Sequence, residues 1–321
     1  MTLGSSLKNA ARVFDTLAVG NLNVDITAFV ESTPPPDGEV EARVFHISFG
    51  GSAANFAVAL SRLSSRVGLI AHIGSDEMGK SALAELEREK VYTRLIRVEK
   101  GRTTGYVLVL VERSGVKRMV AFRGANQLLS SRSLPLKAAR RAKIVHASSV
   151  KPSTAEGIAA KAVRGGAVFT YDPGGSALKY PLKEFAPVLE KTHILFVNST
   201  EVKAITGISD PKKAADVLSE YAPTVVVKMG AKGVYAVGEE EREFIPAFEV
   251  EEVVDTTGAG DAFNAGFIKG LLLGLSFREC CIMGNAVAAL KIAHPGARGG
   301  LPTLQQVSEF LRARGVFIRG L

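Results

Sequence analysis

The chain has 321 residues, of which 46% are hydrophobic and 22% charged, and its formal net charge is +8. This length and composition are those of a globular protein with one large α/β domain or two ordinary ones, and no apolar run of about 18 residues predicts a membrane helix. Basic residues are scattered, apart from KAARRAK at 137–143, which we interpret as an exposed helix face. We therefore expect neither a nucleic-acid partner nor a membrane.

The N-terminal residues lack the apolar core of a signal peptide, and the two cysteines, Cys280 and Cys281, are adjacent in the sequence. Adjacent cysteines without further partners make neither a disulfide framework nor a zinc pattern. Both observations indicate a reduced, cytoplasmic location.

Segments typical of buried strands alternate with helical patterns along the chain. Strands are expected at 15–20, 67–74, 143–147, 167–172, 193–198 and 224–230, and a further strand at 250–255. Helices are expected at 52–65 and 77–90, and in three stretches after residue 258. This alternation predicts an α/β fold with a mostly parallel sheet that is covered by helices on both faces.

Two segments, about 26–49 and 103–123, break this alternation. Both have the period-two pattern of paired strands, and RSG at 113–115 supplies a turn in the second. We expect them to form a small β-sheet lid over one edge of a single domain that spans residues 1–321.

Near the C-terminal end, Gly258, Ala259 and Gly260 directly precede Asp261 and an apolar helix. Glycines let backbone amides face a ligand, and a helix N-terminus favours negative charge, so this segment predicts an anion cradle. Asp261 is placed to take a proton from a hydroxyl that attacks a phosphorus atom held on those amides. The alternative is that Asp261 only caps the helix.

Polar residues also follow two earlier strands. Asn23 and Asp25 lie two apart at the end of a buried strand, so both face the same side and suit a vicinal diol, unless they form an Asx turn. Gly50 and Gly51 permit close approach of a ligand, and Asn55 in the next helix can bond a hydroxyl. A plain strand-to-helix turn is the alternative for this second group.

Two later segments suggest a nucleotide and its metal ion. Asn198 ends a strand, and Glu201 follows three residues later on the same face of a helical turn. Such a pair can hold magnesium-bound waters or phosphate oxygens, or it can cap the helix. The segment VKMGAKG at 227–233 runs from a strand into glycines, a turn that can form the floor of a nucleotide pocket.

Together these motifs resemble the ribokinase family of carbohydrate kinases, also called the PfkB family. DTTGAGDAFNAGF resembles its C-terminal signature, GGSAANFAVALSRLSSRVGLIAHIGSD its N-terminal signature, and Asn198 with Glu201 its N-x-x-E element. The resemblance covers about residues 15–310. It implies a doubly wound α/β sandwich with a β-sheet lid, and transfer of the γ-phosphoryl group of ATP to a hydroxymethyl group of a sugar or nucleoside.

The resemblance also implies roles for individual residues. Asp261 is the catalytic base, and the amides of Gly258, Ala259 and Gly260 form the anion hole. Sugar-binding positions are matched by Asn23, Asp25, Gly50, Gly51 and Asn55, and positions around the nucleotide by Asn198, Lys228, Gly230, Gly233 and Asn285. Lys228 stands where many members have Thr. Glu201 helps to place Mg²⁺ through water, and Asp255 and Thr257 match part of a site for a monovalent cation such as K⁺.

FRGAN at 122–126 and YDPGG at 171–175 resemble archaeal members that act on nucleosides or ribose phosphates. This adds Arg123 and Asn126 to the expected substrate residues. Arg123 is placed either to meet a phosphate on the acceptor or to lie solvated on the lid.

We expect an ATP- and Mg²⁺-dependent kinase of a nucleoside or ribose-type sugar, with ADP left open as the donor. The alternatives are a kinase of a ribose phosphate, fructose, 2-keto-3-deoxygluconate or myo-inositol, and a sugar-binding regulator without catalysis. A dinucleotide-dependent oxidoreductase is disfavoured because no G-x-G-x-x-G follows the first strand. Pairing of two lids would allow a homodimer.

Overall fold

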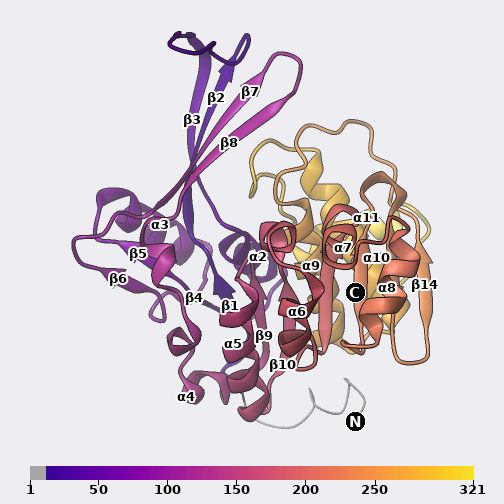
Figure 1. The fold of residues 1–321 in the computed structure, drawn as a ribbon. Helices are drawn as coiled ribbons and strands as arrows, with labels where there is room; N and C mark the ends of the chain where they lie inside the picture. Colours follow the sequence, from indigo (N-terminus) through magenta and orange to yellow (C-terminus); the bar gives the residue numbers. More distant parts are fainter. Residues whose placement is uncertain (1–11) are drawn as a thin grey trace.

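The computed structural model describes residues 12–321 and has an eight-stranded sheet at its centre (Figure 1). In sheet order the strands are β14 (Arg242–Ile245), β13 (Val234–Val237), β12 (Val225–Lys228), β11 (Ile194–Asn198), β10 (Val168–Asp172), β9 (Ala142–Ser148), β1 (Phe14–Gly20) and β4 (Val67–Ile70). Neighbours from β4 to β12 run parallel, and β13 and β14 are antiparallel. The predicted mostly parallel sheet is confirmed.

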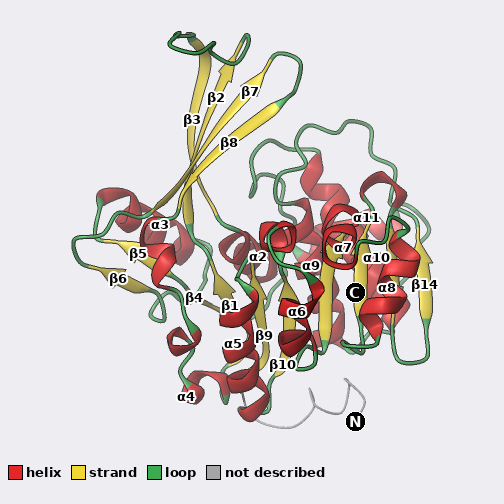
Figure 2. Ribbon diagram, in the orientation of Figure 1, coloured by secondary structure: helices red, strands yellow, loops and turns green. Residues whose placement is uncertain are grey.

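Helices cover both faces of this sheet because its strands are apolar on both sides. In β11, Ile194 and Phe196 belong to one buried cluster, and Leu195 and Val197 to the other. The first layer contains α2 (Ser52–Arg62), α3 (Glu77–Arg88), α9 (Ala259–Leu273), α10 (Phe277–Ile292) and α11 (Leu304–Arg312). The second contains α4 (Leu136–Ala139), α5 (Pro152–Arg164), α6 (Leu182–Leu189), α7 (Ser199–Thr206) and α8 (Pro211–Ser219) (Figure 2).

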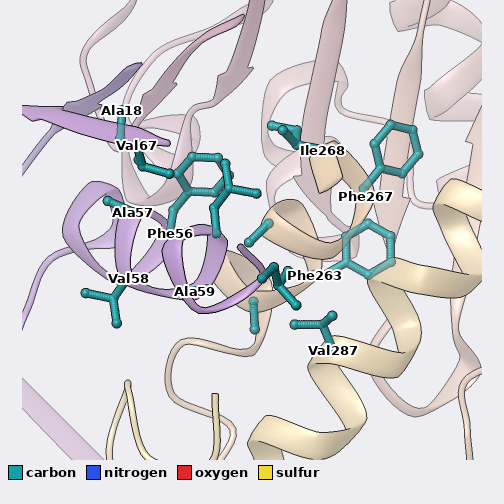
Figure 3. Close-up of a cluster of buried hydrophobic side chains, with 14 of the residues drawn as sticks. Ala18, Phe56, Ala57, Val58, Ala59, Val67, Phe263, Phe267, Ile268 and Val287 are labelled. Carbon is teal, nitrogen blue, oxygen red and sulfur yellow. The ribbon is translucent and has the colours of Figure 1, made fainter. Parts of the chain in front are cut away.

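Close packing in the first layer fixes where α9 begins. Phe56 of α2 and Phe263 and Phe267 of α9 lie in one buried cluster (Figure 3). Gly266 allows α10 to approach, since a Cβ atom there would lie 2.7 Å from the Met283 carbonyl oxygen. Burying one Phe side chain contributes about 1.5–3 kcal/mol, so this packing holds the N-termini of α2 and α9 together.

The second sheet contains four strands and projects from the main body (Figures 1 and 2). Its order is β3 (Ala42–Gly50), β2 (Asn23–Val30), β7 (Gly105–Glu112) and β8 (Lys117–Phe122). Strands β2 and β7 run parallel, and each forms an antiparallel pair with its outer neighbour. These strands come from the two segments that the sequence assigned to a lid. Below, this sheet is called the lid.

Three local predictions were wrong. Residues 67–74 form two strands, β4 and β5 (His72–Gly74), because the chain leaves the main sheet at Ala71 and β5 pairs with β6 (Arg97–Glu99). Residues 250–255 form no strand, since no neighbouring strand pairs with them. KAARRAK is not one helix face, because α4 ends at Ala139 and β9 begins at Ala142.

The expectation that no signal peptide is present falls largely on residues 1–11, which lie outside the described part of the chain. Within residues 12–321, no helix combines the length and hydropathy needed to cross a bilayer.

Candidate active site

Three polar side chains stand at the carboxyl ends of neighbouring strands. Asp172 ends β10, Asn198 ends β11 and Lys228 ends β12. Ligands of open α/β sheets bind at this edge. Helix α9 begins beside it, since a Cβ atom on Gly260 would lie 3.3 Å from Lys228 Nζ. The structure therefore brings the predicted anion cradle to the predicted nucleotide residues.

The first turn of α9 presents unpaired backbone N–H groups. Gly258 is its N-cap with φ 78°, and a Cβ atom there would lie 2.5 Å from the Ala297 carbonyl oxygen, so only glycine fits. The N–H groups of Gly258, Gly260 and Asp261 have no acceptor among the described residues, whereas that of Ala259 donates to the Thr256 carbonyl. The free groups match the predicted cradle, but the N–H of Ala259 is already engaged.

Asp261 lies in this first turn and contacts α2. Its Oδ2 accepts a hydrogen bond of 3.1 Å from Asn55 Nδ2. Burial raises the pKa of Asp261 to about 7, and the negative charge of Asp172 adds to this, while Asn55 and Lys228 oppose it. A carboxyl group with this pKa is suited to accept a proton near neutral pH.

Arg298 holds Asn55 in place and was missed by sequence reasoning. Its Nε donates to Asn55 Oδ1 at 3.1 Å, its Nη1 to Glu85 Oε1 at 2.6 Å, and its Nη2 to the Gly50 carbonyl at 3.4 Å. The side chain is buried in the loop that follows α10. A single arginine in a glycine-rich loop carries no local sign of this role.

Asp25 is a second carboxylate that interacts electrostatically with Arg298. Its Oδ2 approaches Gly50 so closely that a Cβ atom at Gly50 would lie 1.9 Å away, so this pair requires glycine. Burial raises the pKa of Asp25 to about 6, and the positive charge of Arg298 opposes the rise. No hydrogen-bond donor among the described residues reaches the Asp25 carboxylate, which leaves it available to a ligand.

The prediction that Asn23 and Asp25 end a buried strand was wrong. Strand β1 ends at Gly20, and Asn23 begins lid strand β2. Asn23 Oδ1 accepts a 2.8 Å hydrogen bond from Asn126 Nδ2. The side-chain amide of Asn126 also accepts a hydrogen bond from the Leu22 N–H and donates one to the Leu22 carbonyl. Asn126 therefore stabilises the turn that leads into the lid.

The remaining expected substrate residues lie at the base of the lid. Gly51 is the N-cap of α2 with φ 93°, and a Cβ atom there would lie 2.4 Å from the Asn21 carbonyl oxygen. Arg123 is exposed and precedes the short 3₁₀ helix η1 (Gly124–Leu128). Contact with a substrate stays a prediction for Asn23, Arg123 and Asn126.

Lys228 is partly buried and contacts two buried residues that the sequence did not single out as site residues. Its Nζ donates to Asp172 Oδ2 at 2.7 Å and to Asn264 Oδ1 at 3.1 Å, and Asn264 Nδ2 donates to the same Asp172 oxygen at 2.7 Å. Burial alone would raise the pKa of Asp172, but Lys228 and Asn264 lower it. The cluster keeps an ammonium group next to the first turn of α9.

Asn198 and Glu201 form a reciprocal cap on α7. Asn198 Oδ1 accepts from the Thr200 and Glu201 N–H groups, and Glu201 Oε2 accepts from the Asn198 N–H at 2.9 Å. This matches the capping alternative. Burial and the negative charge of Asp172 raise the pKa of Glu201 to about 7. The positive charge of Lys228 opposes this rise. Glu201 Oε1 has no donor among the described residues, so a cation there would satisfy it.

The predicted nucleotide loop contains the 3₁₀ helix η4 (Gly230–Lys232). Gly230 and Gly233 have φ 59° and 102°, and a Cβ atom on Gly233 would lie 2.1 Å from the Ile245 carbonyl oxygen. Asn285 Nδ2 donates to the carbonyls of Ile245 and Pro246. Asn285 therefore fixes the segment after β14, and its contact with a nucleotide stays a prediction.

Comparison with known proteins fits this arrangement. Residues 14–304 match the pfkB family of carbohydrate kinases. The chain belongs to this family. It is 33% identical over 299 residues to an ATP-dependent ribose-1-phosphate kinase of Halopiger xanaduensis, which covers 93% of this chain and 98% of that protein. It is 31% identical over 306 residues to a ribokinase of Haemophilus influenzae, with coverage of 92% and 98%.

The fold of this pfkB kinase is also found in solved structures. Arabidopsis thaliana ribokinase complexed with ribose and ATP superimposes with a TM-score of 0.84 at 25% identity, covering 94% of this chain and 99% of that one. The predicted ribokinase-like fold and kinase class are therefore confirmed. The protein is a phosphotransferase of the carbohydrate kinase class, which acts on an alcohol group.

Proposed function

We propose that this kinase transfers the γ-phosphoryl group of ATP, with Mg²⁺, to the hydroxymethyl group of a ribosyl compound, namely a nucleoside or a ribose-type sugar. The observation that carries the proposal is the difference between two carboxylates, Asp261 and Asp25. Asp261 is bonded to Asn55, whereas Asp25 has no hydrogen-bond donor among the described residues. A sugar diol supplies the donors that Asp25 lacks.

In this proposal, Asp261 accepts the proton of the hydroxymethyl group while the sugar oxygen forms a bond to the γ-phosphorus. The bond from that phosphorus to the oxygen of the leaving ADP breaks, and ADP retains the electron pair. The free N–H groups of Gly260 and Asp261 and the ammonium of Lys228 stabilise the phosphoryl oxygens. Glu201 would help to hold Mg²⁺ through water, and the ion would supply positive charge to the nucleotide phosphates.

A second acceptor class is supported by the Halopiger relative, whose name is ATP-dependent ribose-1-phosphate kinase. Such an acceptor needs a cation for its phosphate, and Arg123 at the base of the lid is the exposed candidate. A free ribosyl acceptor needs no such contact. Fructose, 2-keto-3-deoxygluconate and myo-inositol remain weaker alternatives.

The test is a phosphoryl-acceptor screen in which ADP release is measured with ATP over nucleosides, ribose, ribose 1-phosphate, fructose, 2-keto-3-deoxygluconate and myo-inositol. We expect the highest kcat/KM with a nucleoside or ribose. A higher value with ribose 1-phosphate would select the second class, and preference for a sugar without a ribosyl ring would contradict the proposal. Exchanging ATP for ADP in the same screen identifies the donor.

We further propose that the chain acts as one domain in the cytoplasm and forms a homodimer through the lid. The support is an apolar surface on one face of the outer lid strands, where Phe45 and Ile47 of β3 and Val120 and Phe122 of β8 are exposed. Light scattering of the wild type and of a Phe45→Ser/Val120→Ser variant tests this. A wild-type monomer would contradict it.

A further inference from the structure

The carboxylate of Asp255 lies in the loop before the anion cradle, and both of its oxygens accept hydrogen bonds. Its Oδ1 accepts from Lys117 Nζ at 3.0 Å, from the Thr257 N–H at 3.0 Å and from Thr257 Oγ1 at 2.7 Å. Its Oδ2 accepts from the Gly296 N–H at 3.0 Å. Lys117 begins lid strand β8, so the lid supplies an ammonium group to this loop.

A second ammonium group contacts the same loop from helix α10. Lys291 of α10 is fully buried, and its Nζ donates to the Asp255 carbonyl oxygen at 2.6 Å. That carbonyl is its single hydrogen-bond acceptor among the described residues. Burying an ammonium group costs free energy unless a hydrogen-bond partner compensates for it. The contact therefore indicates that Lys291 specifically binds this carbonyl oxygen.

These contacts use the oxygens that a monovalent cation would need. Asp255 and Thr257 form part of the expected site, to which they would offer their side-chain and backbone oxygens as ligands. Lys117 Nζ already bonds Asp255 Oδ1 and lies 3.4 Å from Thr257 Oγ1, and Lys291 Nζ bonds the carbonyl. A K⁺ ion on these oxygens would stand next to two like charges. The residues present therefore do not fit a resident K⁺.

We infer that Lys117 and Lys291 take the place of the monovalent cation, so that this kinase holds its anion-cradle loop with two ammonium groups of its own and needs no K⁺. One group comes from the lid and donates to the Asp255 carboxylate, and the other comes from α10 and donates to the Asp255 carbonyl oxygen. The loop continues through Thr257 into Gly258, and its charge balance is then independent of the salt present.

The test measures wild-type rate and melting temperature in KCl, NaCl and tetramethylammonium chloride at equal ionic strength. We expect the same values in all three, because the ammonium groups are part of the chain. A rate or melting temperature that rises specifically with K⁺ would overturn the inference. The melting temperatures need no knowledge of the acceptor, so failure of the proposed function would not affect that part of the test.

Lys117→Met removes the lid ammonium and keeps its apolar stem. We expect this variant to turn over slowly in tetramethylammonium chloride and to recover in KCl, because an ion can then reach Asp255. Arg118→Met, the next lid cation along β8, is the matched control and should remain indifferent to the salt. A Lys117→Met variant that is equally slow in every salt, or equally fast, would contradict the inference. Lys291→Met repeats the test from α10, with melting temperature to show whether it folds.

Discussion

Asn55 Nδ2 donates a hydrogen bond of 3.1 Å to Asp261 Oδ2, although the two residues are 206 positions apart. The orientation of this amide is fixed, because Arg298 can only donate and occupies Asn55 Oδ1. The amide nitrogen must then face Asp261. Two side chains, Asn55 from α2 and Arg298 from the loop after α10, thus hold the expected base on α9 in one position.

Replacing Asp261 by Asn keeps the shape of the side chain and removes the proton acceptor. We expect turnover to fall by about 10²–10⁴-fold, the usual contribution of a general base. The affinity for ATP should change little, which isothermal titration calorimetry measures. Near-normal kcat would exclude Asp261 as the base.

The pH dependence of the wild type follows from the pKa of Asp261, which burial raises to about 7. A base must be ionised to accept a proton, so kcat/KM should increase with pH through about 7 and level off above it. Below that pH the carboxyl group is protonated and activity is lost. A rate that is flat from pH 5 to 8 would contradict this assignment.

Removing the amide of Asn55 should shift that profile. Asn55 lowers the pKa of Asp261 by stabilising its ionised form, so Asn55→Ala should move the rise in kcat/KM to higher pH. Hydrogen bonds to charged groups contribute about 1.5–3 kcal/mol, which predicts a loss of about tenfold or more at pH 7.

Arg298 is expected to act on the base through Asn55. Arg298→Met should therefore shift the pH profile in the same direction, and Arg298→Lys should restore part of it. In the double variant with Asn55→Ala, the Arg298 substitution should add no further shift, since coupled residues are not additive. A further full shift would show that Arg298 acts independently of Asn55.

Local patterns in the sequence predicted much of this site but not all of it. Gly258 to Asp261 and the cap of Asn198 with Glu201 are contiguous motifs, so each could be identified within a few residues. Arg298 and Asn264 gain their roles only when the fold brings α2, α9 and β10 together. The false strand at 250–255 has the same cause, since an apolar pattern forms a strand only where a partner strand lies beside it.

Lys228 should contribute to stability and to chemistry, and two variants separate these effects. Lys228→Met leaves Asp172 buried without its partner, so we expect a loss of about 3–5 kcal/mol in the free energy of unfolding, measured with urea. The double variant Asp172→Asn/Lys228→Met removes both charges and should recover most of this stability. Its kcat should stay low if the ammonium assists phosphoryl transfer. Full recovery of kcat would reduce Lys228 to a structural role.

Asp25 and Arg123 together distinguish the two acceptor classes. Asp25→Ala should raise KM about tenfold or more for any ribosyl acceptor, because an unpaired buried polar group costs about 1–3 kcal/mol. Arg123→Ala should reduce kcat/KM only for an acceptor that carries a phosphate, since a charge-assisted contact is then lost. Arg113→Ala, on the lid turn, is the matched control for charge. We expect Arg123→Ala to leave nucleoside and ribose kinetics nearly unchanged. A large loss confined to ribose 1-phosphate would instead identify the phosphorylated acceptor, and an unchanged KM in Asp25→Ala would remove Asp25 from the diol site.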